Sequence, residues 1–253
     1  MKKLFSFLLL GSLAACSTES IFDPSTAVKV ATIETTGDNG FLRSYVYSPD
    51  GQLERVESSR AYDQEYELEY DGEQLSGMSL FLAGTQDLYS RVTVTYNASG
   101  TIRDIEVAYY DDTEEVTSTS SYAYEYDSRN RVKELWTRWG SASDLTLGQR
   151  FHWSGNNIRQ VDYLDEDGEL MHEFFYKYDN RKNYQRGLPA SIYDPVLWGD
   201  HNIVEFSAKD YTGLLDLACN PCNTQYQYNL SGYPVSVTYD WGEDQNITYL
   251  DEE

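Results

Sequence analysis

The stretch from Tyr122 to Leu135, YAYEYDSRNRVKEL, has the pattern of a complete β-hairpin. Three tyrosines alternate with small or polar residues, and every second residue of a strand lies on the same face of a sheet. Asp127 and Asn130 then supply the side-chain hydrogen bonds and the positive φ that a reversing turn requires. Val132 begins the return strand. The stretch therefore predicts two antiparallel strands with one aromatic, buried face.

Variants of this phrase recur seven or eight times along the chain. Other copies begin at Tyr45, Tyr66, Val92, Phe151, Val161, Phe174 and Tyr226. Seven hairpins imply about 14 strands, more than an open twisted sheet tolerates without curling or splitting. We therefore expect an all-β fold. It should be an antiparallel meander of about seven repeated hairpins, curled or folded over into one large sheet or an open barrel, with the aromatic face inside.

The repeated phrase, Tyr-Asp-x-x-Gly/Asn-x-Leu-x-x-Val, resembles the YD (RHS) repeat of secreted bacterial proteins. Residues 176–183, followed by 187–189 and 201–204, are similar to a family of uncharacterised Gram-negative lipoproteins with degenerate YD repeats. In that family an irregular insert separates the last two hairpins. The resemblance covers about residues 45–239. It implies a repeat fold and no catalytic residues.

The first residues have the pattern of an export signal. Lys2 and Lys3 precede an apolar run that is shorter than the roughly 20 residues of a membrane-spanning helix. Leu13-Ala14-Ala15-Cys16 resembles a bacterial lipobox, which implies lipidation of Cys16; an ordinary signal with a chance cysteine is the alternative. We expect a signal peptide (1–15), a lipidated tether (16–27) and a single β-repeat domain (28–253) with an irregular insert (182–222).

The localisation expected from this pattern is the outer membrane, with the domain on the periplasmic leaflet or at the cell surface. The chain has 42 acidic and 19 basic residues and a formal net charge of −23. This charge argues against nucleic acid as a partner and against adsorption to anionic lipid. The expected membrane contact is therefore the N-terminal lipid anchor.

Cys219 and Cys222 are the two remaining cysteines, and a disulfide is the default in an oxidising compartment. A free or redox-active pair and a metal site are the alternatives. A metal site would need further ligands, and the three histidines, His152, His172 and His201, are scattered in the sequence. We expect no metal and no cofactor.

The insert contains SIYDPVLWGDHN, residues 191–202, which is too apolar for an idle loop. We expect it to pack as a plug across one end or one face of the sheet; a lid or binding loop is the alternative. Trp198 and Tyr193 in this loop, with Trp153, are candidate ligand-binding residues because aromatic rings can stack on a sugar. Large aromatic residues are more often buried in a core.

The sequence contains no GxSxG, HExxH, P-loop or dinucleotide-binding pattern. We therefore predict a non-enzymatic outer-membrane lipoprotein whose β-repeat surface binds a glycan or protein partner. One alternative is a carbohydrate-active hydrolase that uses a pair of carboxylates, and another is a purely structural spacer. An enzyme should have a deep cleft and an acid with a raised pKa, whereas a binding module should have a shallow, aromatic-lined face.

Overall fold

The computed structural model describes residues 29–250 apart from 38–39, 62, 141, 143 and 241. The expected signal peptide, Cys16 and the tether lie outside the described residues. Across the described part the chain forms sixteen strands and two short 3₁₀ helices. The strands are β1 (Val30–Thr35), β2 (Phe41–Tyr47), β3 (Leu53–Ser58), β4 (Gln64–Asp71), β5 (Gln74–Leu82), β6 (Leu88–Tyr96), β7 (Ile102–Tyr110), β8 (Val116–Tyr126), β9 (Val132–Trp139), β10 (Thr146–Ser154), β11 (Asn157–Leu164), β12 (Leu170–Lys182), β13 (His201–Asp210), β14 (Cys222–Tyr228), β15 (Pro234–Tyr239) and β16 (Gln245–Tyr249). The 3₁₀ helices are η1 (Pro189–Ser191) and η2 (Pro195–Trp198).

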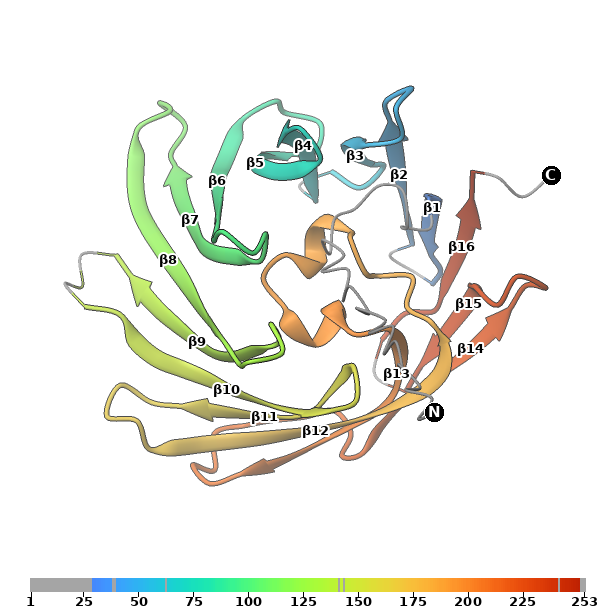
Figure 1. Cartoon of the computed structure of the whole chain (residues 1–253). Helices are drawn as coiled ribbons and strands as arrows, with labels where there is room; N and C mark the ends of the chain where they lie inside the picture. The colour runs from blue at the N-terminus through green and yellow to red at the C-terminus, as the bar shows by residue number, and fades with distance from the viewer. Residues whose placement is uncertain are drawn as a thin grey trace, which may run out of the picture.

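Each strand pairs antiparallel with its neighbours in the sequence, and β16 pairs with β1 (Figure 1). The all-β meander is therefore confirmed, but the barrel is closed, not open. Seven hairpins account for β2 to β15. The expected count missed β1 and β16 because neither strand carries the repeated phrase, yet their pairing from Val30↔Tyr249 to Thr35↔Gln245 closes the barrel.

The barrel has two unlike ends. We call "turn rim" the end where β2–β3, β4–β5, β6–β7, β8–β9, β10–β11 and β14–β15 are joined, where β1 begins and where β16 ends. We call "loop rim" the opposite end, where β1–β2, β3–β4, β5–β6, β7–β8, β9–β10, β11–β12, β13–β14 and β15–β16 are joined. All copies of the repeated phrase span the turn rim except the one that begins at Val161, whose turn at Asp165–Gly168 joins β11 to β12 at the loop rim.

The turns at the turn rim are organised by the aspartate or asparagine of the phrase. Asp127 Oδ1 accepts hydrogen bonds from the backbone N–H groups of Arg129 (2.8 Å) and Arg131 (3.1 Å). Asn97 holds its turn in the same way. Asn130 has a φ of +58°, which asparagine tolerates better than most residues. The predicted turn chemistry is therefore observed.

The tyrosine before each turn also has a defined role. Tyr126 at the end of β8 donates its hydroxyl to the Ile102 carbonyl at the start of β7, at 2.6 Å. The same bond ties each even-numbered strand to the odd-numbered strand before it: Tyr47–Val30, Tyr70–Leu53, Tyr96–Leu75, Trp153–Val132, Tyr178–Ile158, Tyr226–Ile203 and Tyr249–Pro234. Six of these bonds link one hairpin to the preceding one, and the bonds of Tyr47 and Tyr249 join β2 to β1 and β16 to β15. Eight side-chain contacts therefore run around the turn rim.

Residues 183–200, which we call the plug, leave the wall at the end of β12 and lie inside the barrel (Figure 1). Tyr184, Leu188, Ile192 and Val196 of the plug are buried among inward-facing wall residues. A sixteen-stranded barrel is too wide for wall side chains alone to fill. The expected plug therefore packs within the barrel, not across its end or its outer face.

The irregular insert expected over 182–222 is shorter than predicted. Residues 201–210 form the regular strand β13, which pairs with β12 from Lys182↔His201 to His172↔Asp210. The sequence pattern does not predict β13, because no turn of the repeated phrase flanks this strand. The irregular parts are the plug and residues 211–221 at the loop rim.

Candidate functional site

The outward face of the barrel is charged. Residues that pair across the ladder share a face, and those alternating with the buried positions point outward. On β3 to β13 the charged outward residues include Arg55, Glu57, Glu67, Glu69, Arg91, Glu106, Glu125, Glu134, Arg150, Asp162, Glu173, Lys177, Glu205 and Lys209. Several form ion pairs between neighbouring strands, such as Lys177 with Glu205 at 2.8 Å.

Outward apolar residues are scattered among these charges. Trp136 lies opposite Leu147 on β10, and Phe175 lies under the Lys209 ammonium, which is 5.0 Å from the ring centre. The outward face therefore has the composition of a surface in water.

The inward face is apolar near the turn rim and becomes polar toward the loop rim. Arg43 contacts the Asp63 carboxylate at 2.9 Å, and His172 Nδ1 lies 3.1 Å from Asp210. Burial would raise the pKa of Asp63, but hydrogen bonds from Arg43 and Ser58 outweigh it, so the pKa is lowered. The half of the lumen nearest the loop rim thus carries charged and hydrogen-bonding groups.

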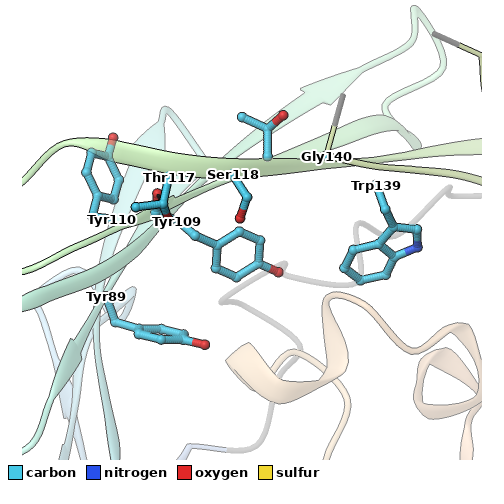
Figure 2. A pocket seen from close by; sticks show the side chains of 8 residues that line it. Tyr89, Tyr109, Tyr110, Thr117, Ser118, Trp139 and Gly140 are labelled. Atoms are coloured by element: carbon cyan, nitrogen blue, oxygen red, sulfur yellow. Dashed lines mark hydrogen bonds between the residues drawn. The ribbon is translucent and has the colours of Figure 1, made fainter. Parts of the chain in front are cut away.

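A hollow of about 560 Å³ opens at the loop rim, on the inner side of β6 to β9. Its lining is aromatic and hydroxylic: Tyr89, Tyr109, Tyr110, Thr117, Ser118, Thr119, Trp139 and Gly140. In Figure 2 the rings of Tyr89, Tyr109 and Trp139 lie on one side of the β-ribbon, around Ser118. This volume is within the range of about 300–1,000 Å³ typical of small-molecule sites. We call it the aromatic hollow.

A small residue on β8 creates the aromatic hollow. Ser118 lies opposite Tyr109 on β7, and Ser120 lies opposite both Val107 on β7 and Trp139 on β9. Ser118, a small inward residue between larger side chains, leaves space that a leucine or tyrosine would fill, whereas Ser120 is buried and lies outside the lining. The run Val116–Ser121, VTSTSS, is the sequence signal for this gap, and sequence reasoning did not identify it.

Contacts between aromatic rings connect the aromatic hollow to the plug. The Tyr89 and Tyr109 rings meet edge to face at 6.0 Å. Trp139 meets Tyr122 at 5.8 Å, and Tyr122 in turn lies 5.8 Å from Tyr193 of the plug. Tyr193, one of the predicted candidates, is therefore partly buried against Tyr122 and does not line the hollow.

Trp198, the second predicted candidate, is partly buried against the barrel wall. Its indole N–H donates to the Ser191 carbonyl at 2.7 Å, and its ring lies 5.3 Å from that of Tyr124. Both contacts hold the plug in place.

Trp153, the third candidate, occupies the tyrosine position of its repeat. Its N–H donates to the Val132 carbonyl at 2.6 Å, and the Arg131 guanidinium covers its ring at 5.5 Å. The structure thus brings none of the three predicted residues into the aromatic hollow. Trp139, which is 59 % exposed, is the tryptophan that lines it.

A second hollow of about 250 Å³ also opens at the loop rim, where β1, β2, β15 and β16 end. It is lined by Thr35, Phe41, Tyr239, Gly242, Glu243 and Gln245. At the same rim, Cys219 of the β13–β14 loop forms a disulfide with Cys222, the first residue of β14. The second hollow and the disulfide therefore both lie at the loop rim.

Asp194 of the plug is an acid inside the barrel. Its carboxyl faces solvent-accessible space, but protein surrounds that space closely enough to raise its pKa. Its Oδ1 accepts a hydrogen bond from the Val196 N–H at 3.0 Å, which opposes the shift. Burial, with a contribution from the charge of Asp194, raises the pKa of Tyr163 on the wall to about 12. The carboxyl therefore lies near the tyrosines of the inner wall.

Within residues 29–250 and their stated gaps, no three His, Cys, Asp or Glu side chains are grouped to hold a metal ion. In the same part of the chain no helix has the length and apolar character needed to cross a membrane.

No family model matches the chain. No curated protein matches its sequence either. The fold is similar to that of a porin-like protein from Bacteroides vulgatus, with a TM-score of 0.57 and 14 % identity over 89 % of this chain and 100 % of that one. A porin-like protein from Bacteroides uniformis gives a TM-score of 0.53 and 11 % identity over 87 % of this chain and 98 % of that one. These likenesses show a shared barrel fold.

A weaker likeness links 80 % of this chain to 10 % of a TcdB2–TccC3 chain, with a TM-score of 0.32 and 14 % identity. This score is too low to indicate a shared fold. The membership of a YD-repeat lipoprotein family stays a prediction.

Proposed function

We propose that this protein is a non-enzymatic lipoprotein of the Gram-negative outer membrane whose barrel stands in water and binds a ligand at the loop rim. The lipid on Cys16 provides its membrane attachment. The barrel is a plugged binding scaffold, and it conducts nothing across the membrane.

The observation that carries this proposal is the charged outward face. A membrane-spanning barrel needs an outward apolar band about 25 Å tall, and each Lys or Arg at its midplane costs about 2–4 kcal/mol. Here charged residues point outward on nearly every strand from β3 to β13, as do the ion pairs of Lys177 with Glu205 and Lys209 with Glu173. Several such residues inside a bilayer would together cost about as much as a folded domain's whole net stability of about 5–15 kcal/mol.

The filled lumen supports the same proposal. Residues of the plug and the wall form two packed clusters, one around Ile192 and Val196 and one around Tyr184 and Leu188. A conducting barrel of this strand number keeps an aqueous channel. The plug occupies that place, so the barrel is suited to holding a ligand at its open end.

The chain ends give the barrel an orientation. β1 begins at Val30 and β16 ends at Tyr249, and both ends lie at the turn rim. A tether from Cys16 therefore joins the barrel at the turn rim. The loop rim, with its aromatic hollow, then points away from the membrane surface.

Cell fractionation of Cys16→Ser tests the proposal. We expect the variant to leave the membrane fraction or to accumulate as an unprocessed precursor, whereas the wild-type protein stays with the membrane. Alkaline carbonate washing of processed Cys16→Ser protein provides the second arm. A barrel that resists carbonate extraction without its lipid is embedded in the bilayer, and this result contradicts the proposal.

Asp194 favours a second candidate, a carbohydrate-active hydrolase, because its raised pKa is a property of a general acid. Glycoside hydrolysis also needs a second carboxylate about 5–9.5 Å away. Activity that is present in the wild-type protein and lost in Asp194→Asn would establish this alternative.

A further inference from the structure

We propose that the aromatic hollow binds a neutral pyranose ring of a glycan. This inference rests on the proposed function and deepens it, because it assigns a site and a ligand class to the loop rim.

Large aromatic rings are exposed inside the concave surface of the hollow. Tyr89 is 40 % exposed and Trp139 is 59 % exposed, although both face the hollow. Exposed apolar surface of this kind on a water-facing domain marks an interaction site. The flat faces of Tyr and Trp accept the C–H face of a sugar ring while their polar tips stay hydrated.

The rest of the lining is polar. Ser118 on β8 faces the hollow with its hydroxyl, and Tyr89 and Tyr109 add their phenol groups. Thr119 lies opposite the outward residue Ala108, and the Thr117 hydroxyl donates to the Tyr109 carbonyl at 3.2 Å. Each hydroxyl can donate one hydrogen bond and accept others, which matches the hydroxyls of a sugar. A fatty acyl chain in the same place would strip water from these groups without replacing its hydrogen bonds, at a cost in free energy. The lining therefore favours a hydroxylated ring over a lipid.

The charges around the hollow favour a neutral ligand. The hollow is lined by tyrosine, tryptophan, threonine, serine and glycine, none of which is charged at neutral pH. The adjoining β7–β8 loop carries Asp111, Asp112, Glu114 and Glu115, all exposed. Four acidic side chains at the mouth repel phosphates, carboxylates and sulfates. A neutral sugar is thus the ligand class that the hollow and its surroundings both accept.

Titration calorimetry on the whole protein tests the inference with defined probes. The panel contains the neutral hexasaccharides of β-1,4-glucose, α-1,4-glucose, β-1,3-glucose, β-1,4-xylose and β-1,4-mannose, with hexagalacturonate as the anionic member. We expect at least one neutral member to bind with a Kd on the order of 1 mM or tighter. Hexagalacturonate should not bind.

Three variants and one control locate the site. Trp139→Ala and Tyr109→Ala should each weaken binding about tenfold or more, because a few aromatic residues dominate most binding energies. Ser118→Tyr should block binding by filling the gap between Tyr109 and Trp139. Tyr211→Ala is the matched control: Tyr211 is 56 % exposed at the same rim but lies outside the hollow. The Tyr211→Ala variant should bind the glycan with the affinity of the wild type.

Circular dichroism melting of each variant confirms that it is folded before binding is compared. Failure of every neutral member to bind, or an equal loss in Tyr211→Ala and Trp139→Ala, overturns the inference. Binding of the anionic member alone also overturns it. These failures leave the fractionation result for Cys16→Ser untouched, so the proposed function and the sugar site are tested separately.

Discussion

The two rims of the barrel are built on different rules. At the turn rim each even-numbered strand ends in a tyrosine or tryptophan contact to the strand before it, as Tyr126 does with Ile102. At the loop rim no such ring recurs within the described residues, and the connections differ in length and content. Most of the exposed large apolar side chains also lie there: Tyr89, Val116, Trp139, Leu145, Leu170, Tyr211 and Leu214.

The turn rim therefore holds most of the contacts that specify the fold, and the loop rim holds the candidate binding site. The repeated phrase specifies strands, turns and the bonds between hairpins, and most of these act at the turn rim or along the wall. At the loop rim the β7–β8 and β11–β12 turns, held by Asp111 and Asp165, use the same turn chemistry, whereas the other connections there are less constrained by the fold. Functional residues are therefore expected at positions that the repeated phrase does not cover.

The largest expected difference is between two tryptophans. Trp198→Ala should destabilise the fold by about 3–5 kcal/mol, because it removes a partly buried ring from Tyr124 and leaves the Ser191 carbonyl without its donor. Trp139→Ala at the loop rim should change stability by less than about 0.5 kcal/mol, because Trp139 is 59 % exposed. Chemical denaturation measures both.

Equal losses of stability in these two variants would show that the loop rim is as deeply involved in folding as the plug. A melting temperature for Trp198→Ala that stays within a degree of the wild-type value would show that the plug does not stabilise the barrel.

The next difference concerns two tyrosines on one strand. Tyr126→Phe removes the hydroxyl that reaches the Ile102 carbonyl at 2.6 Å and leaves a buried acceptor unpaired, so it should cost about 1–2 kcal/mol. Tyr124 is buried, and its hydroxyl has no hydrogen-bond partner among the described residues. Tyr124→Phe should therefore be neutral or slightly stabilising in urea denaturation. A cost of similar size in both variants would contradict a special role for the ring of turn-rim contacts.

The sequence predicts the repeat and its faces because period-two alternation and turn chemistry are local properties. Tyr124 is buried and Glu125 is exposed, as the alternation in Tyr122–Tyr126 indicates. Closure depends on the pairing of β1 with β16, which are more than 200 residues apart and share no phrase. Local pattern carries no information on such a pairing.

The candidate site was harder to predict for a related reason. A tryptophan in the tyrosine position of a repeat, such as Trp153, looks like an exposed platform until its acceptor on the neighbouring strand is known. The aromatic hollow arises from a small residue, Ser118, whose meaning depends on what lies opposite it on the neighbouring strand. Aromatic content alone therefore gave Trp139 no priority over the other tryptophans.

A smaller effect is expected at a single turn. Asp127→Ala removes the acceptor of the Arg129 and Arg131 N–H groups and the ion pair with the Arg131 side chain at 2.7 Å. Burial would raise the pKa of Asp127, but the hydrogen bonds from Arg131 and Arg129 outweigh it and lower the pKa. The contribution of the Asp127 carboxylate to the free energy of unfolding is therefore present above the unfolded pKa near 4 and is lost as pH falls.

Discounted for solvent screening, the loss in Asp127→Ala should be about 1 kcal/mol at pH 7 and should shrink toward pH 3. Thermal melts of both proteins at the two pH values measure it. A difference that stays constant with pH would mean that the charge of Asp127 contributes nothing to the turn.

The smallest effect, and the one of opposite sign, is expected at Asp194 in the plug. Burial raises the pKa of this carboxyl, so the folded state favours its neutral form. The contribution of the neutral carboxyl to stability is lost as pH rises through the folded pKa. Asp194→Asn keeps an acceptor for the Val196 N–H and cannot ionise. The variant should therefore melt at a higher temperature than the wild type at pH 7 and at nearly the same temperature at pH 3.5. Opposite pH slopes for Asp127→Ala and Asp194→Asn would show that the turns of the repeat are stabilised by ionised carboxylates, whereas the lumen tolerates the Asp194 carboxylate at a cost. A variant Asp194→Asn that is less stable at pH 7 would mean that this charge has a favourable partner inside the barrel, and the lumen would then have to be considered as a second binding site beside the aromatic hollow.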